Sequence, residues 1–281
     1  ELCDKWILSK LNQVNIKVAS LLKEYKLGES AKLLYEFTWN DFCDWYVEFA
    51  KQRFNNKETK NRQISEKVLI KVLNDILVMI HPFMPHITEE LWHVLQLKPD
   101  NALLSLQKWP IQENKFVDNK LDNSFQQLFE IIRLIRNLRA ELGLKPSEKV
   151  PVYLISDNDE LIDFLKILVD DIQTLTKSSE VFIFKTNAVD KKEFAKSFSG
   201  IISDLEVYLP FQDFVNIDAL KERLNKDLKK VTIELDNLNK RLSNKNFVDK
   251  APKDIVDECR FKLNEGSVQM ERITKKLELL N

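Results

Sequence analysis

A short stretch of this sequence concentrates side chains that commonly bind metal ions. It holds three histidines and two glutamates: His81, His86, Glu89, Glu90 and His93. Zinc sites need their ligands at set spacings, such as HExxH on one helix, and no such spacing is met here, while Pro82 and Pro85 divide the group. We therefore expect a rigid structural corner and no metal site. Four apolar side chains of this corner are expected to pack inward: Met84, Ile87, Leu91 and Trp92.

The cysteines and glycines of this sequence do not fit a cysteine-based redox or metal site or a phosphate-binding loop. The cysteines Cys3, Cys43 and Cys259 lie far apart, and no pair has the spacing of a redox or metal site. The chain has only four glycines, and they cannot build a loop that cradles phosphate. Sparse thiols are typical of proteins in a reducing compartment, so we expect a cytoplasmic protein.

Basic residues form two local groups on a nearly neutral chain. The net charge is −1, from 43 basic and 44 acidic residues, so any binding to nucleic acid must use local patches. The first group, Arg133, Arg136 and Arg139, spreads over part of one predicted helix. The second lies within 238–262, where seven basic residues accompany four acidic ones. Each group is either a solvated surface or a set of phosphate contacts, and the residues alone leave both interpretations open.

The first half of the chain has the 3.6-residue period of a helical bundle. Helices are expected at 2–24, 29–53, 65–80, 88–97 and 123–142. We expect a polar connection at 55–63, a loop at 98–118 anchored by Trp109-Pro110, Thr88 as a helix N-cap and Gly143 as a C-cap.

The second of these helices carries an aromatic stripe too large for a helix on the surface. Its members recur at spacings of three and four: Phe37, Trp39, Phe42, Trp45, Tyr46 and Phe49. Asp41, Asp44 and Glu48 are expected to keep the opposite side in water. The stripe predicts a helix packed against several others.

After Lys145 the hydrophobic period changes to that of strands. Strands are expected at 150–155, 180–185 and 205–210, with a less regular one at 196–203, and a helix at 159–177. No catalytic motif falls in this small α/β module, and we interpret it as a spacer that orients the segment after it.

The last part of the chain predicts an antiparallel coiled coil. A heptad seam runs through Leu220, Leu224, Leu228, Val231, Leu235, Leu238 and Leu242. The segment 243–253 interrupts it, and a return helix carries Val256, Cys259, Leu263, Met270, Ile273, Leu277 and Leu280. Each helix of roughly 25 residues would span about 35–40 Å.

The first residues of the chain and its apolar runs bear on targeting and on whether the chain is a fragment. No apolar run is long enough to span a membrane, and the first residues, ELCDKW, are not a signal peptide. Because the chain begins with Glu rather than Met, we expect a fragment of a longer protein.

Four stretches resemble the C-terminal part of the valyl-tRNA synthetase family, a class I family. They are WNDFCDWYVEFAK (39–51), HPFMPHITEELW (81–92), IRNLRAELGLKPSEKVPVYL (135–154) and KNFVDKAPKDIVDECRFKLNE (245–265). The last is similar to the NFxxKAPxxV pattern of this family, whereas the isoleucyl family carries a cysteine-rich metal site there. The HIGH-like and KMSKS-like sequences of the catalytic half do not occur in this chain.

The resemblance implies a mainly α fold in three regions. These are an anticodon-binding helical bundle at 1–145, a connecting α/β module at 146–215 and a coiled-coil arm at 216–281 that reaches the tRNA elbow. It implies tRNA(Val) as the partner, no membrane association, and a monomer. The parent would be a valine–tRNA ligase that holds ATP and Mg²⁺ in its missing catalytic domain, so this piece needs no cofactor and is expected to be inactive alone.

Candidate RNA contacts follow from the basic residues near these regions. They are Lys51, Arg53, Arg133, Arg136, Arg139, Lys250, Lys253, Arg260 and Lys262. The alternative function is a non-enzymatic helical scaffold whose coiled coil binds a protein partner. That alternative would gain support if the return helix left the apolar seam of 220–242 exposed.

Overall fold

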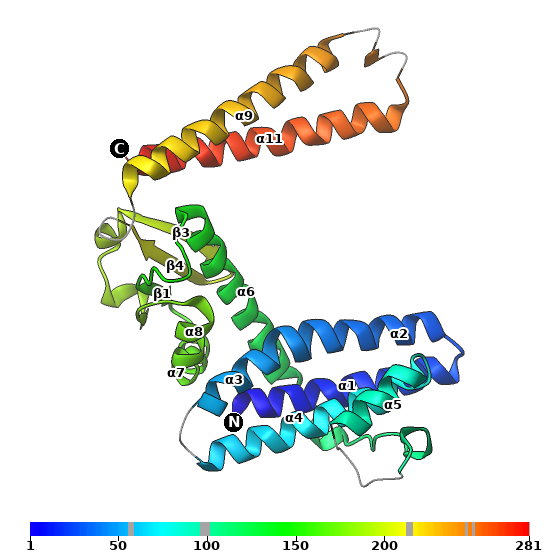
Figure 1. Cartoon of the computed structure of the whole chain (residues 1–281). Coiled ribbons are helices and arrows are strands. Elements are labelled where there is room, and N and C mark those ends of the chain that lie inside the picture. The colour runs from blue at the N-terminus through cyan, green and yellow to red at the C-terminus, as the bar shows by residue number, and fades with distance from the viewer. Residues whose placement is uncertain (56–58, 96–101, 212–215, 245–246, 249–250, 281) are drawn as a thin grey trace. The chain divides into compact units, whose positions relative to one another are not determined.

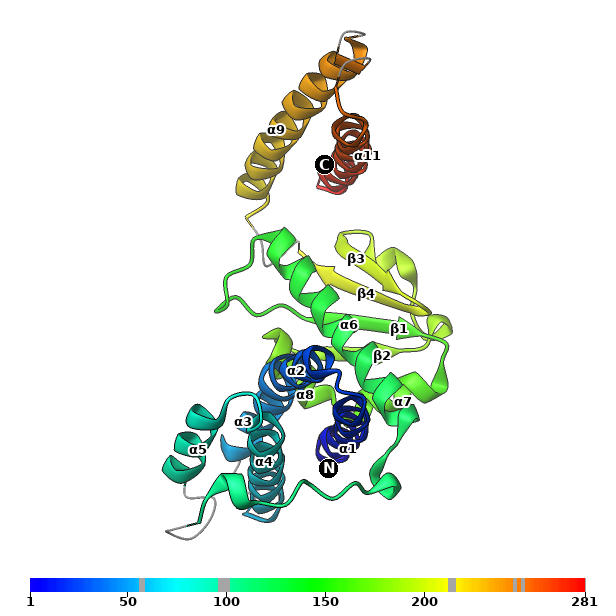
Figure 2. The same cartoon turned by 90° about the vertical axis from the view of Figure 1, so that its right-hand side faces the viewer.

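The structure is a computed structural model that describes residues 1–55, 59–95, 102–211, 216–244, 247–248 and 251–280. Its first part is helical, as predicted. The elements are α1 (Leu2–Lys23), α2 (Leu27–Glu36), a π-helical segment (Phe37–Tyr46), α3 (Val47–Asn55), α4 (Thr59–Ile80), α5 (Pro85–Val94) and α6 (Asn119–Leu142). Figure 2 shows α1 and α4 nearly end-on beside α2 and α3.

Stacked aromatic rings form the centre of this bundle. The ring of Trp6 lies 5.0 Å from that of Phe125 and 5.1 Å from that of Phe129, measured between centroids. The ring of Trp45 stacks on Phe129 at 4.0 Å. Close ring pairs add to the stabilisation that burial of their large apolar area supplies. The predicted aromatic core is therefore confirmed, and α6 adds two rings to it, Phe125 and Phe129.

The π-helical segment changes which side chains of the aromatic stripe are buried. A π-helix has i→i+5 hydrogen bonds, and the amide of Val47 here donates to the carbonyl of Phe42. The wider turn rotates Trp39 out of the stripe, so that 53% of its surface is exposed. The prediction that Trp39 packs inward is wrong, because it assumed a constant 3.6-residue period.

Asp41 also departs from its predicted environment. It is half-buried, whereas the sequence placed it on the wet side of the helix with Asp44. Burial raises the pKa of Asp41 to about 6, with Lys10 opposing and Asp122 adding to the shift. The prediction holds for Asp44, which is exposed.

The corner at 81–94 differs from its prediction in two respects. Helix α5 begins at Pro85 and not after Thr88; the Thr88 hydroxyl donates to the carbonyl of Met84 at 2.8 Å and lies 2.8 Å from Nδ1 of His81. Of the four apolar residues expected inside, only Trp92 is buried. The remaining three are 43–52% exposed: Met84, Ile87 and Leu91.

The two polar connections of the bundle are shorter or better anchored than the sequence indicated. Helix α4 starts at Thr59, inside the stretch 55–63 that was predicted to be a connection, and 56–58 lie outside the described residues. The loop before α6 contains short 3₁₀ turns at Leu104–Leu106 and Asn114–Phe116. Its predicted anchor is confirmed, because Nε1 of Trp109 donates to Oδ1 of Asn15 at 2.6 Å.

A four-stranded sheet follows in the order β2-β1-β4-β3. The strands are β1 (Val152–Ser156), β2 (Val181–Phe184), β3 (Ser197–Ile202) and β4 (Leu205–Pro210). Strands β1 and β2 are parallel, and the other pairs are antiparallel. The helix expected at 159–177 is divided at Leu168 into α7 (Asp159–Ile167) and α8 (Val169–Thr176).

Helix α6 packs on the buried face of this sheet. The register places Gly200, Val207 and Leu154 on that face, and a Cβ built on Gly200 would lie 2.6 Å from a methyl carbon of Leu134. Glycine therefore permits the close approach of helix and strand.

The chain ends in a helical hairpin of α9 (Ile217–Ser243) and α11 (Lys253–Leu279), which lie side by side (Figure 1). Their facing leucines and valines are buried, as the heptad seam predicted: Leu220, Leu224, Val231, Leu235 and Val256. Gly266 of α11 faces Leu235, and a Cβ there would lie 2.8 Å from Cδ2 of that leucine.

By its contacts the chain divides into two compact units, Glu1–Glu130 and Ile131–Asn281. The division falls inside α6 and so differs from the three regions expected from the sequence, because this one helix contributes to both units. Among the described helices, none combines the length and the apolar character needed to cross a membrane.

Candidate nucleic-acid interface

The nine predicted RNA contacts do not form one patch. Two arginines are buried in structural roles, one residue (Lys250) lies outside the described residues, and the rest are exposed on helices. The exposed ones are Lys51, Arg133, Arg136, Lys253, Arg260 and Lys262.

Arg53 belongs to a buried ion-pair network of the bundle. Its Nη1 lies 3.3 Å from Oδ1 of Asp4 and 3.3 Å from the hydroxyl of Ser65, and the guanidinium also bonds Cys3 and Glu1. The hydroxyl of Tyr46 donates to the same Asp4 oxygen at 2.8 Å. A guanidinium with buried partners cannot turn to a phosphate without giving up its ion pair with the buried Asp4. The structure thus gives Arg53 an interior role, and its contact with RNA stays a prediction.

Arg139 is buried as well, and it organises the turn after α6. Its Nη2 donates to the carbonyl of Glu148 at 2.8 Å and to that of Lys145 at 3.4 Å. The carboxylate of Glu148 in turn accepts from the amide of Lys145 at 2.7 Å. Arg139 therefore also has an interior role, because its Nη2 holds backbone carbonyls inside the fold, and its contact with RNA stays a prediction.

The remaining bundle candidates are exposed but not equivalent. Lys51 pairs with Glu48 on its own helix at 2.5 Å, and both side chains are exposed. Arg136 donates from Nε to the carbonyl of Leu175 at 3.0 Å, at the end of α8. Arg133 is exposed on α6. Their availability to RNA stays a prediction.

On the arm, the predicted cations of α11 are paired with acids of the same helix. Arg260 lies 3.6 Å from Asp257, and Lys262 lies 2.6 Å from Glu258. These exposed ion pairs are weak, but their carboxylates partly neutralise the positive charge that would attract a phosphate. Lys253 at the start of α11 makes no ion pair among the described residues.

Helix α9 offers cations that sequence reasoning missed. It carries seven basic and five acidic residues, whereas α11 carries six of each. Lys229 and Lys240 of α9 are exposed, and neither pairs with an acid in the part of the chain that the structure describes. They are three helical turns apart on one side, about 16 Å along the axis. Comparing the charge of each helix separately would have found them.

One group of described residues has ligand atoms close enough to hold a metal ion. Glu1, Cys3 and Asp4 place such atoms within 4.8 Å of one another. The guanidinium of Arg53 already occupies this group, as described above, and a bound cation would have to displace it. Two of the histidines instead bind neighbours in the corner: Nδ1 of His81 lies 2.8 Å from the hydroxyl of Thr88, and Nε2 of His93 lies 3.2 Å from Glu89.

Comparison with known proteins adds two matches in chain order. Residues 4–154 match the family model of the anticodon-binding domain of tRNA ligases, and residues 216–281 match the tRNA-binding arm of valyl tRNA synthetases. The arm match coincides with the hairpin of α9 and α11.

The chain belongs to the valyl-tRNA synthetase family. It is 73% identical over 280 residues to the valine–tRNA ligase of Prochlorococcus marinus subsp. pastoris. It is 39% identical to that of Synechocystis sp. and 33% identical to that of Petrotoga mobilis. Each alignment covers 99–100% of this chain.

This valyl-tRNA synthetase chain spans only about 30% of the length of these relatives. It corresponds to their C-terminal part, as the resemblance of the sequence implied. The bundle and the arm are thus the two regions with which an RNA interface is associated in this family.

Proposed function

We propose that this chain is the tRNA-recognition part of a longer valine–tRNA ligase and binds tRNA(Val) through the bundle and the arm. The bundle would read bases of the anticodon loop, where unstacked bases are accessible to side chains. The arm would contact phosphates of the elbow. ATP and Mg²⁺ would be bound by the part of the longer protein that this chain lacks.

The observation that carries this proposal is the coincidence of two RNA-binding family models with two separately folded elements. The anticodon-binding model covers the helical bundle, and the arm model covers a hairpin whose apolar seam is closed. The hairpin ends in exposed lysines and arginines on both helices. A near-neutral chain with such local cations should bind RNA with modest affinity that depends on salt.

The test is a titration of labelled tRNA(Val) transcript with the 281-residue chain at several salt concentrations. Affinity should weaken as salt rises, because phosphate contacts release counterions. A second elongator tRNA measures specificity, and a chain ending at residue 215 measures the contribution of the arm. Binding that did not change with salt would rule out the phosphate-contact account.

The alternative function is a scaffold whose coiled coil binds a protein partner, and the packing of the hairpin disfavours it. That role would need an apolar seam available to a partner. The seam residues of α9 are instead covered by α11, with Leu224, Val231 and Leu235 each at most 7% exposed. We further propose that the protein is a monomer, which sedimentation of the purified chain would test, and that it is cytoplasmic, which cell fractionation would test.

A further inference from the structure

Helix α6 ends in a glycine turn that leaves the carbonyls of Glu141 and Leu142 without a backbone donor among the described residues. Gly143 has φ of 72° and its amide donates to the carbonyl of Ala140 at 3.0 Å, while the amide of Leu144 donates to that of Arg139 at 3.1 Å. This glycine C-cap satisfies two of the last carbonyls of the helix. The carbonyl of Glu141 remains for another partner.

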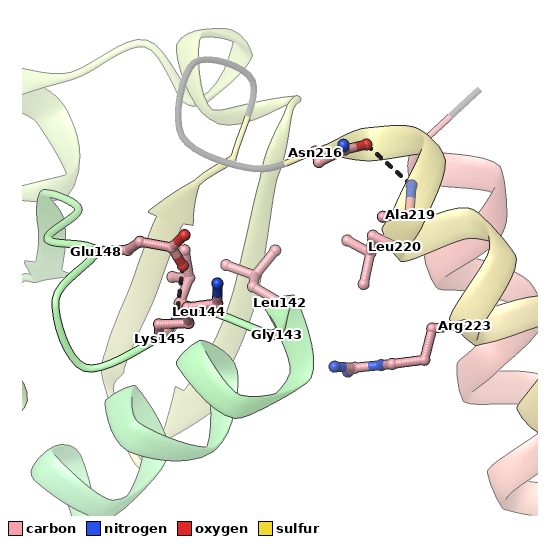
Figure 3. Close-up of a pocket in the computed structure, with 9 residues that line it drawn as sticks. All are labelled: Leu142, Gly143, Leu144, Lys145, Glu148, Asn216, Ala219, Leu220 and Arg223. Carbon is pink, nitrogen blue, oxygen red and sulfur yellow. Dashed lines mark hydrogen bonds between the residues drawn. The ribbon is translucent and has the colours of Figure 1, made fainter.

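Arg223 of α9 supplies that partner. Its Nη2 donates to the carbonyl of Glu141 at 2.6 Å and to that of Ala140 at 3.2 Å. Figure 3 shows the guanidinium directed from α9 toward the end of α6. A cation at a helix C-terminus is also favoured by the helix dipole.

The second helix of the arm holds the same turn of α6. Nζ of Lys276, on α11, lies 2.6 Å from the carboxylate of Glu141 and 5.7 Å from the ring centre of Phe198 in β3. Lys276 is less exposed than the paired lysines elsewhere on the arm, with 23% of its side chain accessible. One residue of α6, Glu141, therefore meets both helices of the arm, through its carbonyl and its carboxylate.

Apolar packing alone does not close this junction. A cleft of about 340 Å³, open to solvent, lies beside Arg223 and is lined by Leu142, Leu144, Ala219 and Leu220 (Figure 3). Side chains that line such an open cleft do not interlock as side chains do in a close-packed interior. The direction of the arm at its root therefore depends on the hydrogen bonds and the ion pair more than on side-chain interlocking.

We infer that Arg223 and Lys276 are positioning residues, which hold the root of the arm on the end of α6 and set the direction in which the arm meets RNA. This inference rests on the proposed function, tRNA binding by bundle and arm together. Once the bundle has bound the tRNA, the arm binds the same molecule more readily if its attachment already holds it in the right direction. Loosening the root should thus weaken binding without removing a phosphate contact.

The experiment measures arm orientation and RNA binding separately in the whole chain. Spin labels are attached through genetically encoded keto amino acids at Asp170 of α8 and Asn239 of α9, both exposed, so that the cysteines stay in place. Distance distributions are recorded for the parent and for Arg223→Met/Lys276→Met. The matched control is Lys226→Met/Lys275→Met, which removes the same charge from the same two helices but breaks only pairs within each helix.

The parent and the control should each give a narrow distribution, and the Arg223/Lys276 variant a broader one. Affinity of that variant for tRNA(Val) transcript should fall about three- to tenfold below the control, with an unchanged salt slope. The exchange Lys276→Glu with Glu141→Lys, which conserves charge, should restore a narrow distribution that Lys276→Glu alone loses.

Three results would overturn the inference. An unchanged distance distribution in the double variant would show that the root is held otherwise. A reduced salt slope would mean that these cations contact phosphate directly. If the charge exchange did not restore the narrow distribution, the ion pair between Lys276 and Glu141 would not be what holds the arm. Because the distance measurement uses no RNA, failure of tRNA binding in the parent would refute the proposed function and leave the junction tested.

Discussion

At the scale of single residues, the cations of the arm differ in how far their charge is already compensated. Arg260 and Lys262 form ion pairs with acids one turn away on α11. Lys229 and Lys240 on α9 form no ion pair among the described residues, although Asp236 lies one turn before Lys240. A phosphate that displaces an existing partner gains less than one that meets an uncompensated cation. We therefore rank the α9 lysines above the α11 cations as RNA contacts.

The first prediction compares these two pairs. Lys229→Ala/Lys240→Ala should reduce the slope of log affinity against log salt by about two, one for each lost phosphate contact. Arg260→Ala/Lys262→Ala should reduce it by less. Neither change should alter the free energy of unfolding by more than about 0.5 kcal/mol, because all four side chains are exposed. Titration of tRNA(Val) at several salt concentrations checks the slopes, and equal slopes in both variants would refute the ranking.

The second prediction concerns the half-buried carboxylate of Asp41. Its pKa of about 6 in the folded state lies above the ordinary value of 3.8, so folding favours the protonated form. Asp41 should destabilise the protein above pH 6, and this effect should disappear as the pH falls toward 4. Asp41→Asn should raise the free energy of unfolding at pH 7 by about 1–3 kcal/mol and change it little at pH 4.

Tryptophan fluorescence during urea unfolding measures this, because all five tryptophans lie in the unit Glu1–Glu130. The control is Asp44→Asn, on the same segment but exposed, which should change stability by less than about 0.5 kcal/mol. A gain from Asp41→Asn that was equal at both pH values would contradict the titration argument.

Site residues could be predicted from the sequence only in part. Periodicity indicates which side of a helix a residue occupies, but not what lies opposite. Arg53 and Arg139 look like surface cations in sequence, and only the positions of Asp4 and of the turn carbonyls at 145 and 148 show that they are interior. No local signal carries that information, since Asp4 is about 50 positions away from Arg53.

At the scale of elements, periodicity predicted nearly every helix and strand, and it failed where the helical period itself changes. The π-helical segment exposes Trp39, and the break at Leu168 divides the helix predicted at 159–177. The first failure arises because a pattern of apolar spacings presumes one turn width throughout, and the second because one non-helical residue, Leu168, does not interrupt the apolar pattern. Strand bounds were predicted well, because the β-branched and aromatic runs are short and separated by turn residues.

The third prediction tests close packing within the arm. Gly266→Leu should destabilise the hairpin by about 1–3 kcal/mol, because its side chain would enter the space of Leu235. Adding Leu235→Ala should recover part of the loss. The control Ser267→Leu places the same side chain on the exposed side of α11. Hydrogen exchange of α9 and α11 reports local stability, and equal protection in both leucine variants would refute close packing at Gly266.

At the scale of the whole molecule, the order of parts agrees with the resemblance of the sequence: a bundle, a small α/β module and a hairpin arm. What the sequence did not predict is that α6 serves two compact units, with Phe125 and Phe129 in one and Leu134 against Gly200 in the other. The amphipathic pattern of a helix does not reveal that its two halves have different partners.

The fourth prediction concerns catalysis. The chain alone should give no valine-dependent ATP–pyrophosphate exchange, since it spans about 30% of its relatives' length and lacks the HIGH-like and KMSKS-like sequences. The full-length valine–tRNA ligase of Synechocystis, a relative of 39% identity, serves as the positive control. Robust exchange by the purified chain would overturn the proposed division of labour.

The stacking of Trp6 on Phe125 has a consequence for synthesis on the ribosome. The two rings are about 120 residues apart in sequence, so α1 emerges long before its main aromatic partner exists. At about 5–20 residues per second the delay is roughly 6–24 s. During that time the apolar side of α1 has no completed core to join and offers a binding surface to chaperones. Among the helices of this chain α1 is made first, yet its aromatic side is completed only by the last helix of the bundle.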